Sequence, residues 1–147
     1  MTSRKRLVFI SHTGTDTWVA RQIEREVAAR GAGTFLDYAH VEIGEQFEVK
    51  LIKALNQADE FLMLLTPWAL EHHYYIWSEA GVAWGRELPI IGILHGMTTS
   101  EFLSKPNIPA YLKSDNLQDL NGIDRYFEEL AKRIKSKKAS KTKAKRR

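Results

Sequence analysis

The chain has 147 residues, of which 44% are hydrophobic, enough for one domain with a sizeable core. It contains no cysteine, which excludes disulfides, thiolate metal sites and cysteine nucleophiles. The 22 basic residues outnumber the 18 acidic ones, giving a net charge of +4, and neither a secretory signal nor an apolar run of about 20 residues is present, so we expect a cytoplasmic protein that does not enter a membrane.

Short apolar runs alternate with amphipathic stretches along the chain, which is typical of a parallel sheet covered by helices. Residues 7–10, LVFI, are predicted as a buried first strand. After the loop SHTGTD, a helix is predicted to begin at Asp16 or Thr17, with an apolar residue at every fourth position over residues 19–27, and to end near Gly31 and Gly33.

The next segments continue the alternation. Residues 34–36 are predicted as a second short strand, followed by a polar loop over residues 37–44, DYAHVEIG. A helix with an apolar face then runs through residues 47–55, and residues 60–66, EFLMLLT, form the third strand.

The helix predicted over residues 72–86 carries Glu79 where its apolar side should lie. At about 100° per residue, Ile76, Val82 and Ala83 all fall within about 60° of Glu79. A carboxylate there is either satisfied by hydrogen bonds at a helix contact or part of a pocket. Its place after a strand's carboxyl end, facing the same crevice as FISHTGTD, favours the pocket.

Residues 88–94, LPIIGIL, are predicted as a fourth strand, and a short fifth strand is placed near residues 111–117. A last helix is predicted over residues 123–134. The pattern indicates one α/β domain over residues 1–134, a doubly wound parallel sheet with helices on both faces.

Residues 135–147, KSKKASKTKAKRR, hold eight basic residues and no acidic one. The rest of the chain has 14 basic and 18 acidic residues, a net charge of −4. Such a polar run is predicted to be a disordered tail. A solvated tail or a linker is favoured over loose binding to nucleic acid or acidic lipid.

Other chemistries find less support in the sequence. The segment FISHTGTD could hold a phosphate at a helix start, but a simple capped turn is favoured because it matches no phosphate-binding motif. The five histidines have no metal-ligand spacing, so no metal site is expected. Ser11, His12 and Asp16 are too close in one loop to form a catalytic triad.

Taken in order, the segments VFISHTGTD, FLDYAHVEIGE, LLTPWAL and IWSEAGVAWGRELPIIGIL resemble the TIR (Toll/interleukin-1 receptor) domain family, in its bacterial type. The resemblance covers roughly residues 6–134 and implies a flavodoxin-like sheet of strand order 2-1-3-4-5. DYAHVEIGE looks like the BB loop of that family.

Many bacterial and plant TIR domains hydrolyse NAD+ at the nicotinamide–ribose bond, and their essential glutamate corresponds to Glu79. The resemblance implies that NAD+ is a substrate and that no other cofactor is needed. It also implies a substrate crevice lined by Ile10, Ser11, His12, Gly14, Asp37, Trp68 and Tyr75. Tyr75 stands where many active members have tryptophan, which leaves open whether the product is ADP-ribose or a cyclic isomer.

The resemblance also leaves a second function open. Animal TIR adaptors are not enzymes and bind partners through the BB loop, here Asp37 to Gly44. For either function we expect self-association through that loop and a sensor partner or fused sensor domain. A role in bacterial antiphage defence or signalling is implied, and Glu79 favours the enzyme.

Overall fold

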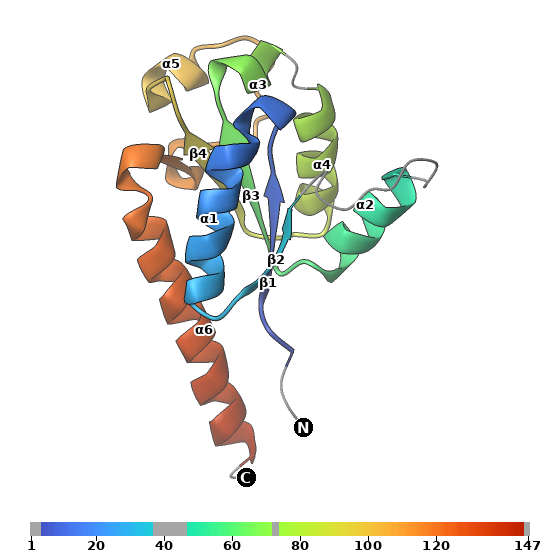
Figure 1. Ribbon diagram of the computed structural model, residues 1–147, viewed down its shortest axis with the longest axis vertical. Coiled ribbons are helices and arrows are strands. Elements are labelled where there is room, and N and C mark those ends of the chain that lie inside the picture. The colour runs from blue at the N-terminus through green and yellow to red at the C-terminus, as the bar shows by residue number, and fades with distance from the viewer. Residues whose placement is uncertain (1–3, 37–46, 72–73, 146–147) are drawn as a thin grey trace.

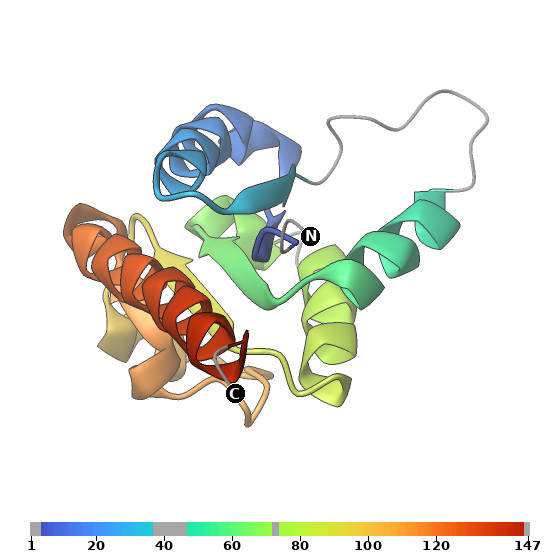
Figure 2. The ribbon, with the colours of Figure 1, turned by 90° about the horizontal axis from the view of Figure 1, so that it is seen from below.

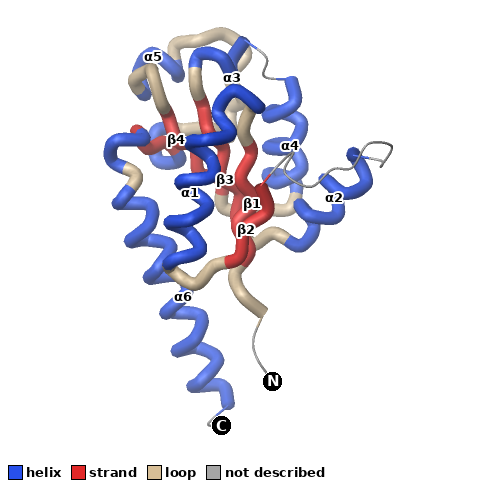
Figure 3. Tube along the Cα trace, viewed as in Figure 1, coloured by secondary structure: helices blue, strands red, loops and turns tan. Residues whose placement is uncertain are grey.

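The computed structural model of the protein describes residues 4–36, 47–71 and 74–145, with the backbone alone for 47–50, 74–75 and 137–145. Five parallel strands form one sheet in the order β2-β1-β3-β4-β5 (Figure 3). The strands are β1 Leu7–Ser11, β2 Gly33–Leu36, β3 Glu60–Leu65, β4 Ile90–Leu94 and β5 Leu117–Asp119. The predicted doubly wound parallel sheet and its strand order are confirmed.

Helices cover both faces of this sheet, as Figures 1 and 2 show. The α-helices are α1 Thr17–Ala29, α2 Phe47–Gln57, α3 Pro67–Glu71, α4 Tyr74–Gly85, α5 Thr99–Leu103 and α6 Asp124–Lys145, and the short 3-10 helices are η1 Gly14–Asp16, η2 Ser114–Asn116 and η3 Leu120–Gly122. We call the two sides of the sheet the α1–α6 face and the α2–α4 face after the helices that pack on them.

Alternating strand residues supply the two cores, because successive side chains of a strand point to opposite faces. In β1, Val8 and Ile10 are buried on the α1–α6 face, whereas Phe9 is buried on the α2–α4 face. All six residues of β3 are buried, since β3 lies between β1 and β4 with helices on both sides. This explains why the strands read as continuous apolar runs in the sequence.

Helix α1 begins and ends close to where its pattern predicts. Ile23 and Val27 are buried on the sheet, and the chain leaves the helix at Gly31, whose φ of +95° is a left-handed conformation that glycine adopts without strain. The expectation that Gly33 also ends the helix is wrong, because Gly33 belongs to β2.

Two helices and one strand differ from the prediction. The five-residue helices α3 and α5 were not predicted, because little more than one turn leaves no periodic signal. Strand β5 begins at Leu117, where the predicted strand over 111–117 was expected to end. The predicted loop over residues 37–44 lies outside the described residues.

Helix α6 is longer than predicted, because it continues from Ile134 to Lys145. The predicted disorder of the tail is therefore wrong for residues 135–145, which are helical. Lysine and alanine are both good helix formers, and extending an existing helix needs no new nucleus. In this segment helix propensity therefore prevails over the high charge from which disorder was predicted.

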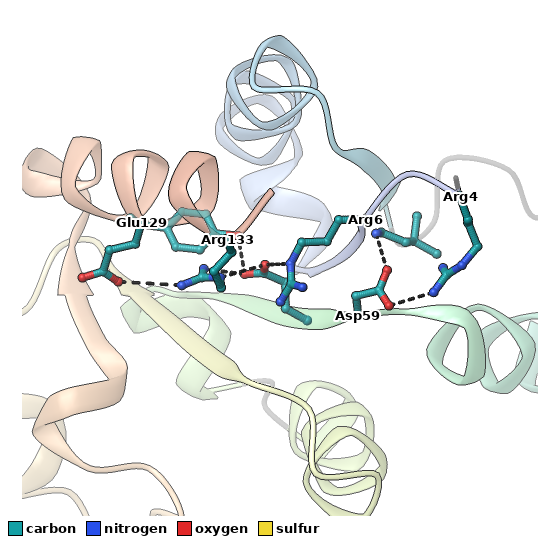
Figure 4. A network of polar contacts seen from close by, with 8 residues as sticks. Arg4, Arg6, Asp59, Glu129 and Arg133 are labelled. Carbon is teal, nitrogen blue, oxygen red and sulfur yellow. Dashed lines mark hydrogen bonds and ion pairs between the residues drawn. The ribbon is translucent and has the colours of Figure 1, made fainter. Parts of the chain in front are cut away.

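A buried ion cluster joins the sheet to α6 at the amino-terminal edge of the strands (Figure 4). The Glu60 carboxylate is fully buried and accepts hydrogen bonds from Arg6 Nε at 2.5 Å, Arg133 Nη2 at 3.0 Å and the Tyr126 hydroxyl at 2.9 Å. Burial, together with the neighbouring Glu60 carboxylate, raises the pKa of the Tyr126 hydroxyl, which therefore stays protonated and donates. The cluster fixes α6 across β1 and β3.

Replacing Glu60 with glutamine should lower the free energy of unfolding by about 3 kcal/mol, because two guanidinium groups then face a neutral amide in a buried site. Chemical denaturation of the two proteins measures this loss. The matched control is Glu129→Gln, since Glu129 also pairs with Arg133 but is 51% exposed. It should change the free energy by less than about 0.5 kcal/mol. Equal losses in both variants would contradict the role assigned to Glu60.

Candidate functional site at the carboxyl edge of the sheet

Ser11 ends β1 at the edge of the sheet from which the ligand-binding loops of such folds emerge. It pairs in register with Met63 of β3. Because Phe9 lies on the α2–α4 face, strand alternation places Ser11 on that face too. Its side chain is fully buried, and its hydroxyl makes no hydrogen bond among the described residues. The hydrogen-bonding capacity of this hydroxyl is therefore unused among the described residues.

Glu79 lies on α4, the helix that packs on the same face of the sheet. It is 1% exposed, and its helical neighbours Ile76, Ala80 and Ala83 all belong to the core between α4 and the sheet. The predicted burial of this carboxylate is therefore confirmed. The prediction that Val82 shares its apolar side is wrong, since Val82 is 37% exposed. At three positions, or about 300°, from Glu79, it falls on the edge of the stripe and faces solvent.

The loop after β1 is held to the start of α3 by Asp16. The Asp16 carboxylate accepts hydrogen bonds from the hydroxyls of Thr13 at 2.9 Å and Thr66 at 2.7 Å. The Thr66 hydroxyl in turn accepts from the backbone N–H of Ala69 in the first turn of α3. Asp16 occupies the N-cap position of α1, as predicted, but its side chain makes no cap hydrogen bond. It connects two loops that follow neighbouring strands.

The Asp16–Thr66 contact was missed by the sequence argument. A signal for it exists, because an acid and a hydroxyl residue follow β1 and β3, two strands that the predicted order makes neighbours. Parallel neighbours end at the same edge, so polar residues of the loops that follow them can meet.

The other predicted residues of the β1 loop take different positions. Ile10 is fully buried in the α1–α6 core, so it can meet a ligand only through its backbone. His12 is 2% exposed, and its Nε2 lies 3.3 Å from the hydroxyl of Thr17 at the start of α1. Gly14 begins η1, and no heavy atom outside its immediate surroundings would touch a Cβ added there. The loop therefore leaves open space at Gly14.

The remaining predicted residues lie around the same edge or outside the described part. Trp68 is the second residue of α3 and is 46% exposed. Tyr75 lies on α4 one helical turn before Glu79, and only its backbone is described. Asp37 lies outside the described residues. The structure thus places Ser11 and Trp68 at the carboxyl edge of the sheet, and Glu79 on the helix that packs on the same face as Ser11.

The competing chemistries gain no support from the geometry. The β1 loop closes on itself, because the N–H of Asp16 and the hydroxyl of Thr17 donate to the backbone carbonyls of Thr13 and Gly14. This is a closed turn, as favoured over a phosphate site, but no side chain caps the start of η1 or α1. The Asp16 carboxylate bonds to threonines and not to His12, so no triad forms there. Within the described residues, no three acidic or histidine side chains cluster as metal ligands.

A separate cavity of about 350 Å³ is formed by residues of α3, α4 and the segment 105–108. It is lined by Pro67, Leu70, Glu71, Trp77 and residues 105–108. Trp77 is two positions, or about 200°, from Glu79 on the helix. This cavity is therefore distinct from the site around Glu79.

Among solved structures, the chain is similar to several domains of one fold. The TIR domain of the Toll-related receptor TRR-2 from Hydra magnipapillata matches with a TM-score of 0.65 and 17% identity, covering 87% of this chain and 97% of that one. A metazoan TIR-STING receptor from C. gigas matches at 0.62 and 18% identity, covering 86% and 39%. A prokaryotic SEFIR domain matches at 0.56 and 20% identity, covering 88% and 92%. These likenesses establish the fold.

The family follows from the sequence match. Residues 8–135 match the family model of the TIR domain, so the chain belongs to the TIR domain family. A search of curated proteins found no significant match. Among the described residues, no helix has the length and apolar character needed to cross a membrane.

The bond between Asp16 and Thr66 should appear as a coupling energy in a double-mutant cycle. Asp16→Ala and Thr66→Val each remove one partner, and because the acceptor is charged the coupling should be about 1 to 3 kcal/mol. Urea denaturation of the four proteins measures it. Asp16→Ala combined with Thr34→Val serves as control, since Thr34 donates instead to Glu24. A coupling for Asp16 and Thr66 no larger than the control's would rule out the bond.

Proposed function

We propose that this TIR domain hydrolyses NAD+ at the bond between nicotinamide and ribose, with Glu79 as the catalytic carboxylate. The observation that carries the proposal is the position of Glu79. It is 1% exposed, on a helix that packs against the sheet, and on the same face as the buried hydroxyl of Ser11. A buried carboxylate at such a position is the kind of group that functional sites hold.

The chemistry needs little more than such a carboxylate. When the C–N bond breaks, nicotinamide leaves as a neutral molecule, and positive charge develops on the ribose ring. The carboxylate of Glu79 stabilises that charge and can accept a proton from the attacking water, whose oxygen bonds to the ribose carbon. The products are nicotinamide and ADP-ribose. Attack by a group of the substrate itself would yield a cyclic isomer.

Neighbouring residues have properties that suit this substrate. The hydroxyl of Ser11, which makes no hydrogen bond among the described residues, can bond to a ribose hydroxyl. Trp68, which is 46% exposed, offers an aromatic face to a planar ring. Tyr75 can do the same from α4, one turn before Glu79. His12, Gly14 and Asp37 complete the proposed crevice, with NAD+ as a substrate and no further cofactor.

The proposed setting is the cytoplasm of a bacterium, in antiphage defence or signalling. Self-association through residues 37–44, triggered by a sensor partner or a fused sensor domain, would bring several domains together. Clustering of this kind is the expected switch for cleavage.

A second function, as an interaction module without catalysis, has one observation in its favour. Trp84 is 60% exposed near the end of α4, and its ring stacks on Tyr111 with centroids 5.5 Å apart. This exposed stack at the end of α4 presents apolar surface of the kind used for docking. A module of this type would bind its partner whether or not Glu79 is present.

Glu79→Gln should lower the rate of nicotinamide release from NAD+ at least about a hundredfold, because an amide cannot stabilise the developing positive charge. The assay uses concentrated or artificially clustered protein, with nicotinamide and the second product separated by chromatography. Thermal unfolding of both proteins checks that the variant is folded.

The matched control is Glu71→Gln, the same change at an exposed position of α3, which should leave the rate within about twofold of the wild type. If the wild type releases no nicotinamide under any clustered condition, the enzymatic proposal is wrong. Binding of a partner that is lost in Trp84→Ala and kept in Glu79→Gln would then support the interaction module.

A further inference from the structure

Helix α6 continues well beyond the residues that pack against the sheet. Arg133 bonds to the buried Glu60, and Ile134 is the last of the described side chains of α6 to pack on the α1–α6 core. From residue 135 to Lys145 the helix runs past the end of the sheet, as Figure 1 shows. At 1.5 Å per residue these 11 residues extend about 17 Å. We call residues 135–147 the arm.

The charge of the protein is divided between this arm and the rest of the chain. The arm has eight basic residues and no acidic one, whereas residues 1–134 have a net charge of −4. A polyanion is therefore attracted by the arm and repelled by the domain. This separation confines contact to the arm and keeps the polyanion away from the sheet.

The spacing of lysines along the arm places like charges within one helical turn of each other. Lys137, Lys141 and Lys145 follow one another at four-residue intervals, and Lys135 and Lys138 add a three-residue spacing. Like charges at these spacings repel each other on a helix. A row of phosphates would remove that repulsion, so binding and helix stability should increase together.

The composition of the arm favours nucleic acid over a membrane surface as its binding partner. Helices that lie in a membrane surface insert large apolar side chains, and the apolar residues of the arm are Ala139 and Ala144 alone. Contact with phosphate oxygens needs no such side chains and gives affinity without sequence readout. We propose that the arm binds the phosphate backbone of nucleic acid, independently of the NAD+ site.

The test compares two variants of the chain, each of which loses five positive charges. The arm variant carries K137Q, K138Q, K141Q, K143Q and K145Q, and the body variant carries K5Q, K53Q, K105Q, K113Q and K132Q, all at exposed positions of the domain. Glutamine keeps the helix preference of lysine. Fluorescence anisotropy with a labelled DNA duplex of about 20 base pairs measures binding between about 50 and 200 mM salt.

The wild type should bind with a log K that falls linearly with log salt, and the arm variant should bind at least about tenfold more weakly with a slope shallower by about four. The body variant should bind within about threefold of the wild type and with the same salt slope, because its arm is unchanged. Far-UV circular dichroism should show a gain in helix when the duplex is added to the wild type or the body variant, and none when it is added to the arm variant.

Equal weakening of both variants would overturn the proposal, because net charge and not the arm would then explain binding. Binding to anionic phospholipid vesicles under conditions in which the duplex does not bind would overturn it as well. Neither outcome bears on nicotinamide release, which is measured without nucleic acid.

Discussion

The structure depends first on the burial of Glu60 at the start of the central strand. A fully buried carboxylate is tolerated only when cations and hydrogen bonds surround it, and Arg6, Arg133 and Tyr126 supply these from the segment before β1 and from α6. Because Arg6 is joined to β1 and Glu60 to β3, the cluster holds the register of the two strands at one end. At the other end, the same register places Ser11 beside Met63.

The two edges of the sheet use their polar groups differently. At the amino edge, the Glu60 carboxylate is bonded to three partners, one from the segment before β1 and two from α6. At the carboxyl edge, Asp16 joins the loops after β1 and β3, which holds the surroundings of Ser11 and Trp68 in place. The hydroxyl of Ser11 makes no hydrogen bond there among the described residues. A polar group with unused bonding capacity beside rigidly held loops is what a binding site needs, and it supports the proposed site around Glu79.

The sequence predicted most where a physical pattern was long. The apolar runs of β1, β3 and β4 and the four-residue period of α1 lie within a few residues of the observed elements. The prediction failed for short elements, because α3, α5 and β5 have only three to five residues and owe their form to the contacts around them. The predicted end of α6 was wrong for another reason. The high charge of residues 135–145 indicated disorder, whereas their helix propensity prevails. For the site, the burial of Glu79 was predicted, but the exposure of Val82 and the Asp16–Thr66 bond were not.

By itself the sequence determined the alternation of strands and helices, the parallel sheet that this alternation requires, and the unusual place of Glu79 on an apolar helix side. These follow from periodicity, which is local and needs no knowledge of contacts. Only the tertiary structure decided which polar groups meet. Glu60 and Arg133 are far apart in the chain, and so are Asp16 and Thr66, yet each pair is in hydrogen-bond contact. No spacing along the chain encodes such pairs, because strand order and helix placement bring them together.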